Sequence, residues 1–211
     1  MLDDYSSWFN NLLDENQSRD KHIADIIAFA ASRDDKHNLS LHIIVTECKY
    51  CQDTAEAKRS LEQTKNTVSK LLLVLSQEKS HKKSSFSIPV WLNRFTSMIL
   101  QSDIIFSENA IKTEDFYKTL HQIRNGQMEV TLNGYSHYFA FEQGSSSLEK
   151  PSTVGDLPVY QQIFSKTEII ELLTSLAKGD NLYELIKQVK GVEAAYEFNS
   201  IPLMELSLIH I

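Results

Sequence analysis

Apolar positions in the first part of the chain follow two periods, one typical of helices and one typical of strands. Apolar side chains recur at helical spacing over residues 2 to 14, which predicts an amphipathic helix. Residues 22 to 31 alternate with a period of two and predict a mostly buried strand, and the β-branched, apolar residues 39 to 50 predict a second strand. An apolar stripe over residues 53 to 75 predicts a long helix packed on these strands, followed by another helix around residues 91 to 101.

The second part of the chain predicts a smaller unit built around a hairpin. Residues 127 to 132 and 135 to 141 flank Asn133-Gly134, and this dipeptide between two apolar runs is the strongest short-range signal for a β-hairpin. We expect the aromatic side chains of the hairpin to pack in a core, with stacking on nucleic-acid bases as the alternative. Two short helices are predicted at about residues 166 to 177 and 181 to 190.

The succession of two strands and a long helix predicts an α/β fold, with α+β packing as the alternative. We expect a mixed sheet with flanking helices, to which a smaller unit of a hairpin and helices is attached. The expected organisation is an α/β core over residues 1–105, a helix and β-hairpin extension over 106–143, a Ser/Pro/Gly-rich linker over 144–158 and a helical segment over 159–205.

The last residues of the chain have a second interpretation. Leu206 to Ile211 can be encoded by CTG TCT CTT ATA CAC ATC, which is the transposon mosaic end used as an adapter in sequencing libraries. We therefore interpret residues 206–211 as adapter read-through and exclude them from fold reasoning, with a short natural apolar tail as the alternative. On this interpretation the natural protein continues beyond residue 205.

Composition and charge narrow the classes of function. With 42% hydrophobic and 23% charged residues, the chain has the make-up of an ordinary globular protein. The formal charge of -7 means that contact with nucleic acid must rest on a local basic patch, for which Lys79, Lys82 and Lys83 form the best cluster unless they are only a solvated loop. There is no apolar run of about 20 residues and no export signal, so we expect a cytoplasmic protein without membrane contact.

Three ionisable side chains are predicted to converge at the ends of the two adjacent strands. Glu47 and Lys49 are two positions apart and therefore share one face, while Asp25 lies between the apolar Ile23 and Ile27. An ionised carboxylate in such surroundings is costly unless a cation compensates it. Two carboxylates and a backbone carbonyl suit Mg²⁺ or Mn²⁺, with Lys49 placed to orient or activate water. The alternative is a surface Glu47/Lys49 pair with Asp25 capping a turn.

This arrangement resembles the motif of the PD-(D/E)xK nuclease superfamily: an Asp, then about one hairpin later Glu-x-Lys at a strand end, then a helix. The matching residues are Asp25 in HIADIIAF and Glu47-Cys48-Lys49 in LHIIVTECKYC, and the resemblance covers roughly residues 1 to 105. It implies a restriction-endonuclease-like core and Mg²⁺-dependent hydrolysis of a DNA phosphodiester. Asp25 and Glu47 would be metal ligands, the Cys48 carbonyl a third ligand, and Lys49 the group that stabilises charge or positions water.

The resemblance leaves two positions open. Many members of the superfamily carry an acidic residue on the first helix, and Asp4, Asp14 or Glu15 would fill that role here. Members often carry a Gln on the helix after the motif. Gln63 lies at about that place but points away from the apolar stripe on a helical wheel, which is a departure from the pattern.

The segments LDDYSSWF, ADIIAF, VTECKYC and WLNRF also resemble, more loosely, the region ahead of the motor in large HerA-type ATPases of DNA-phosphorothioation-dependent restriction. This resemblance implies a bacterial DNA-defence protein whose partners are DNA and either a motor in the same natural chain or other defence subunits. The present sequence contains no G-x-x-x-x-G-K-[ST] phosphate loop, so we assign no NTPase activity to it.

Two other functions remain open. Cys48-Lys-Tyr-Cys51 is a C-x-x-C motif between a strand and a helix, as in thioredoxin-like redox proteins, although Asp53-Thr54 caps the helix better than the cysteines do. The second alternative is a non-catalytic scaffold, in which a degenerate nuclease core docks DNA or a partner. A Ser/His/Asp hydrolase has no support because the chain lacks a nucleophile elbow.

Overall fold

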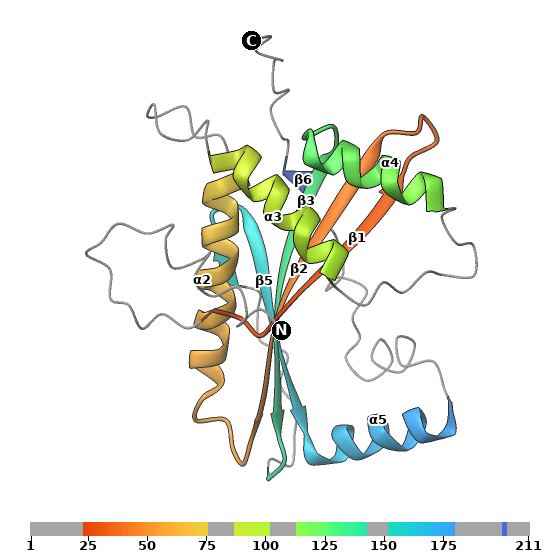
Figure 1. Cartoon of the computed structure of the whole chain (residues 1–211). Coiled ribbons are helices and arrows are strands. Elements are labelled where there is room, and N and C mark those ends of the chain that lie inside the picture. The colour runs from red at the N-terminus through yellow and green to blue at the C-terminus, as the bar shows by residue number, and fades with distance from the viewer. Residues whose placement is uncertain (1–22, 76–86, 102–112, 143–151, 180–199, 202–211) are drawn as a thin grey trace. The chain divides into compact units, whose positions relative to one another are not determined.

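The computed structural model describes residues 23–75, 87–101, 113–142, 152–179 and 200–201, which form an α/β fold (Figure 1). The fold class predicted from the sequence is therefore confirmed. The elements in chain order are β1 (Ile26–Arg33), β2 (Leu39–Cys51), α2 (Ala57–Leu75), α3 (Ser87–Gln101), α4 (Thr113–Arg124), β3 (Glu129–Ala140), β4 (Ser152–Val154), β5 (Leu157–Ser165), α5 (Lys166–Lys178) and β6 (Ser200–Ile201). The helices predicted over residues 2 to 14 and 181 to 190, the lysine cluster and residues 206–211 lie outside the described residues.

The strands belong to one mixed sheet with the order β1-β2-β3-β5-β4, and β6 pairs with β3. Strands β3 and β5 are parallel, with a register that runs from Gly134 opposite Val159 to Ala140 opposite Ser165. Strand β4 is antiparallel to β5, and β6 is antiparallel to β3. The sheet thus combines strands from both sides of residue 105.

The predicted hairpin around Asn133-Gly134 is wrong, because residues Glu129–Ala140 form the single strand β3. A Cβ on Gly134 would lie only 2.7 Å from Cγ2 of Val68 and 3.1 Å from Cγ2 of Thr64, both on α2. Gly134 therefore serves the close approach of a helix to the sheet, which glycine suits as well as it suits a tight turn. The neighbouring Asn133 is fully buried, which a turn at the surface would not allow.

The predicted linker and helical segment also need correction. Strand β4 lies inside the predicted linker over 144–158, and the parallel strand β5 occupies the start of the segment predicted as helical. Helix α5 is confirmed, and its start is fixed by a capping box in which the Ser165 N–H donates to the Glu168 carboxylate at 2.8 Å. Gly179 ends the helix in the left-handed conformation (φ 79°).

Strand β1 begins later than predicted and lies at one edge of the sheet. Most of its side chains are exposed, so the prediction of a mostly buried strand is wrong. The alternation of the sequence is nevertheless present, since Asp25, Ile27 and Phe29 are half-buried while Ile26 and Ala28 are exposed. An edge strand keeps its period of two but has a neighbouring strand on one side only.

Contacts within the chain divide it into two compact units, which we describe separately. The first unit comprises the described parts of Met1–Ala28, Ile44–Lys70 and Asn133–Asn199. In it, α2 is fastened to β3 and β5 by polar contacts as well as by apolar packing. The Ser60 and Ser136 hydroxyls lie 2.8 Å apart, and the Gln161 amide donates to the Ala57 carbonyl at 2.6 Å.

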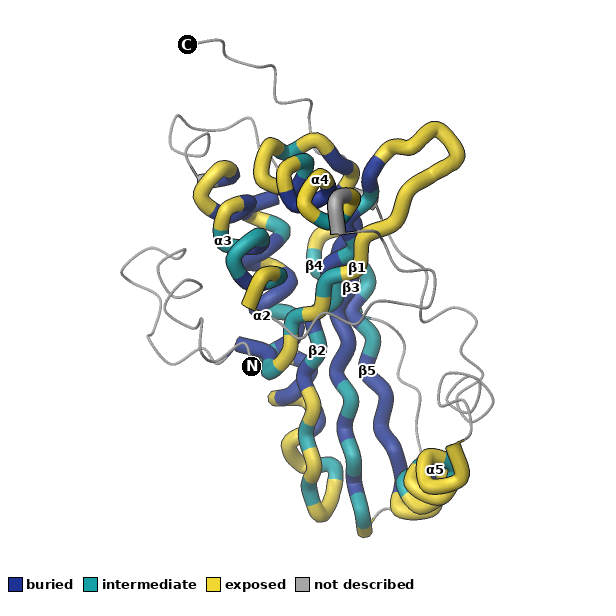
Figure 2. The backbone as a smooth tube through the Cα atoms, turned by 45° about the vertical axis from the view of Figure 1, so that its right-hand side comes forward, coloured by how far each residue is buried: buried dark blue, intermediate teal, exposed yellow. Residues whose placement is uncertain are grey.

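The second unit comprises the described parts of Phe29–Ile43, Leu71–Leu132 and Ser200–Ile211. Its core includes Trp91 and Phe95 on α3, whose ring centroids are 5.6 Å apart, and Figure 2 shows the alternation of buried and exposed residues along that helix. The turn before β2 is closed by the Asp34 side chain, which accepts the backbone N–H of Asn38 at 2.7 Å.

No helix in the described part of the chain has the length and apolar character needed to cross a membrane.

Candidate functional site

The Asp25 carboxylate lies next to the middle residue of the Glu-x-Lys motif. Asp25 immediately precedes β1, and its Oδ2 accepts a hydrogen bond from the backbone N–H of Cys48 at 3.1 Å. The segment before Asp25 is held against α2, because the Ala24 N–H donates to the Thr67 hydroxyl at 2.8 Å. The structure therefore brings Asp25 together with the strand that carries Glu47 and Lys49.

Glu47 is a buried acid at the end of an apolar row. Burial alternates along β2, and Val45 and Glu47 are 0% and 3% exposed on the same face. Burial of a carboxylate costs free energy unless charge or hydrogen bonds compensate it. The alternative of a surface-exposed Glu47/Lys49 pair does not fit this burial.

Lys49 continues the row of Glu47 and is half-buried. Within the described part of the chain, Lys49 makes no ion pair with Asp25 or with Glu47. Its ammonium group is therefore not committed to neutralising either carboxylate there. A lysine in this state can contact a further anion or a water molecule.

Cys48 contributes its backbone N–H to the site through the hydrogen bond to Asp25. Desolvation, and the negative charges of Asp25 and Glu47, raise the pKa of the Cys48 thiol. That both charges act on Cys48 places the two carboxylates around the same residue. Reactive cysteines have lowered pKa values, so the direction of the shift opposes a redox role.

The geometry of the C-x-x-C motif also opposes a redox role. Both cysteines are free and both belong to β2. Residues three apart on an extended strand are separated by about 10 Å and point to opposite faces. A disulfide needs Cα atoms within about 7 Å, so Cys48 and Cys51 cannot bridge without unfolding the end of the strand.

The carboxylates of Asp25 and Glu47 have the chemistry of a site for a hard divalent cation. Among the described residues no group of three or more His, Cys, Asp or Glu side chains is placed to hold a metal ion. The predicted set contains only two such side chains, with the Cys48 carbonyl as the third ligand. The acidic residues considered for the first helix, Asp4, Asp14 and Glu15, lie outside the described residues. Oxygen ligands of this kind fit Mg²⁺ or Mn²⁺, which retain bound water.

Lys70 is a buried basic residue that the sequence pattern did not single out as a candidate for the functional site. Its side chain on α2 is 3% exposed, as is that of Glu47 in the same unit. The signal that could have found it is its spacing, since it follows Thr67 by three positions and so borders the buried face of the helix. Gln63 is half-buried one turn before Thr67, and its carbonyl accepts the Thr67 hydroxyl at 3.1 Å.

No protein-family model, no curated protein and no solved structure matches this chain.

Proposed function

We propose that the chain carries a metal-dependent DNA phosphodiesterase of the endonuclease type and forms part of a bacterial DNA-defence or restriction protein. The observation that carries the proposal is the 3.1 Å hydrogen bond from the Cys48 N–H to the Asp25 carboxylate. It unites two elements of the motif, Asp and Glu-x-Lys, that are separated by a whole hairpin in the sequence. The resemblance to PD-(D/E)xK nucleases gives the reaction that this combination would serve.

Each residue of the motif has a distinct role in the proposal. Asp25 and Glu47 would hold Mg²⁺ or Mn²⁺, which supplies an activated water molecule and neutralises charge on the phosphate. The Cys48 amide fixes the orientation of the Asp25 carboxylate. Lys49 positions the attacking water or stabilises the negative charge that develops on the phosphate.

The partner in this proposal is DNA, and a motor ATPase or other defence subunit would act with it. Because the chain is acidic overall, the cation at Asp25 and Glu47 also reduces repulsion of the DNA backbone at this point. A scaffold with a degenerate core is the second candidate, favoured by the absence of a third acidic side chain at the site within the described part of the chain.

The test is cleavage of plasmid DNA, with and without phosphorothioate linkages, by the full chain in Mg²⁺ and in Mn²⁺. We expect metal-dependent strand breaks that fall by at least about a hundredfold in Asp25→Asn and Glu47→Gln, since loss of a metal ligand removes several kcal/mol of stabilisation. Glu62→Gln is the matched control, because Glu62 lies on the exposed side of α2 and pairs with Lys65.

Cleavage that persists in Glu47→Gln would refute the mechanism. If the wild-type chain binds DNA but does not cut it in either metal, the scaffold is the correct interpretation.

A further inference from the structure

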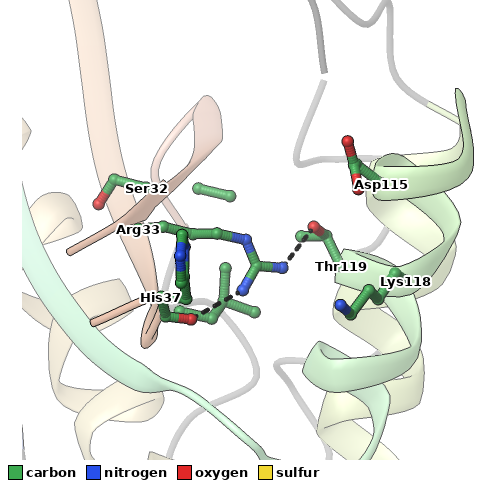
Figure 3. A pocket seen from close by; sticks show the side chains of 8 residues that line it. Ser32, Arg33, His37, Asp115, Lys118 and Thr119 are labelled. Atoms are coloured by element: carbon green, nitrogen blue, oxygen red, sulfur yellow. Dashed lines mark hydrogen bonds between the residues drawn. The ribbon is translucent and has the colours of Figure 1, made fainter. Parts of the chain in front are cut away.

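The second unit contains a cavity of about 500 Å³ between the turn after β1 and the helix α4 (Figure 3). Its polar lining consists of Ser32, Arg33, His37, Asp115, Lys118 and Thr119. A cavity of this size accommodates a small ligand or one unit of a polymer. None of these residues belongs to the candidate nuclease site.

Arg33 is held rigidly in the cavity by neutral groups. Its Nη1 donates to the His37 carbonyl at 3.1 Å, and its Nη2 donates to the Thr119 hydroxyl at 3.2 Å and to Gln122 Oε1 at 2.6 Å. These bonds fix the guanidinium in place without neutralising its charge. A fixed guanidinium with donors to spare is the preferred protein group for planar or tetrahedral oxyanions.

Lys118 adds a second positive charge to the same space. Figure 3 shows its ammonium group pointing toward the Arg33 guanidinium across the cavity, whereas the Asp115 carboxylate lies farther along the helix. Within the described part of the chain, Lys118 forms no hydrogen bond or ion pair. Two like charges that face one cavity repel each other unless an anion lies between them.

Ser32 lines the cavity, but its hydroxyl group points away from Arg33 and Lys118 (Figure 3). Its Oγ lies 2.7 Å from Nε2 of His42, whose Nδ1 lies 2.7 Å from the Thr131 hydroxyl. Burial lowers the pKa of His42, so this imidazole is neutral at pH 7 and adds no charge. The Ser32 hydroxyl is therefore bound to His42 and is not among the groups that face the cavity.

We propose that this cavity binds a phosphate group, carried by a nucleotide or by a nucleic-acid strand. Arg33 provides the fixed fork of donors, Lys118 provides the second positive charge, and the Thr119 hydroxyl lies beside the Arg33 guanidinium. Two cations match a phosphate better than they match a carboxylate, and the volume leaves room for the group that the phosphate esterifies. The site does not depend on the metal-dependent reaction proposed above.

The test is isothermal titration of the full chain with inorganic phosphate, with AMP and with a short single-stranded oligonucleotide. We expect Lys118→Gln to weaken binding by about tenfold, as expected for one charged hydrogen bond. Arg33→Lys, which keeps the charge but loses the fork, should weaken it as well. Arg124→Gln is the matched control, because Arg124 lies in the last turn of α4 and does not line the cavity.

Lys118 is exposed, so Lys118→Gln tests binding without disturbing the fold. A substitution of Arg33 also removes a link between the turn and α4, and so it affects folding as well as binding. Binding of phosphate or AMP that is lost in Lys118→Gln supports a nucleotide as the ligand. Binding confined to the oligonucleotide, with the same loss, supports a strand. If no probe binds, or if Lys118→Gln and Arg124→Gln bind equally well, the proposal is wrong.

Discussion

The Asp25 carboxylate accepts the backbone N–H of Cys48 at 3.1 Å, so the contact depends on the side chain of Asp25 but not on the side chain of Cys48. The hydrogen bond joins the residue before β1 to the end of β2. It positions Asp25 beside Glu47, which is buried on the same strand as Cys48.

Because this contact uses the side chain of Asp25 but only the backbone of Cys48, substitutions of these two residues should differ in their effect on stability. Asp25→Ala should lower the free energy of unfolding by about 1 kcal/mol, because a hydrogen bond to a carboxylate at a partly exposed position is lost. Cys48→Ala keeps the backbone donor and should leave stability within about 0.5 kcal/mol of the wild type. Urea unfolding followed by circular dichroism measures both. If Asp25→Ala is as stable toward urea as Cys48→Ala, the contact does not stabilise the fold.

The proposed metal site at Asp25 and Glu47 predicts a second effect, on thermal stability. A ligand that binds only the folded chain stabilises it by about 2.7 kcal/mol at a hundredfold excess over its Kd. We expect Mn²⁺ to raise the Tm of the wild-type chain, and this increase to disappear in Asp25→Asn and in Glu47→Gln. A melting curve recorded with and without EDTA provides the measurement. The same increase in all three proteins would place the cation elsewhere.

Close packing at Gly134 predicts a third effect. In Gly134→Ala the new Cβ would lie 2.7 Å from Val68 Cγ2 and 3.3 Å from Val159 Cγ1, so the Val68 side chain or the helix that carries it must shift. Overpacking of this kind costs about 1 to 3 kcal/mol. Gly179→Ala is the comparison, because nothing lies within 4 Å of a Cβ there and its cost would come from the left-handed backbone (φ 79°) alone. Thermal unfolding that is unchanged in Gly134→Ala would contradict this packing.

The same glycine explains which parts of the fold the sequence could predict. Strand β2 and helix α2 follow from alternation and from an apolar stripe, which are local consequences of burying one face. Asn133-Gly134 is ambiguous, because glycine permits a tight turn and also a close helix, and the deciding contact with Val68 is distant in sequence. The predicted hairpin failed for that reason.

The two candidate sites also differ in how far the sequence alone can predict them. The closeness of Asp25 to the strand that carries Glu47 could be predicted, because a hairpin turn brings the start of one strand to the end of the next. The phosphate cavity could not, because Arg33 and Thr119 are 86 positions apart and meet only after α4 has packed on the second unit's sheet residues. No local pattern marks such a pair.

His137 predicts a dependence of stability on pH. Burial lowers the pKa of His137 from 6.5 to about 4, so the folded chain holds this imidazole neutral over a range in which the unfolded chain protonates it. The unfolded state therefore binds more protons between about pH 6.5 and pH 4, and stability falls as the pH is lowered through that range. The loss approaches roughly 3 kcal/mol below pH 4, at 1.36 kcal/mol for each pH unit.

Urea unfolding of the wild type, His137→Gln and His121→Gln between pH 4 and pH 8 separates this contribution from that of other groups. His121 is the control because it is a histidine that lies exposed on α4. His137→Gln should flatten the decrease in stability between pH 6.5 and pH 4. If both variants retain the full decrease, another group titrates on unfolding and the His137 imidazole is not kept neutral by the fold.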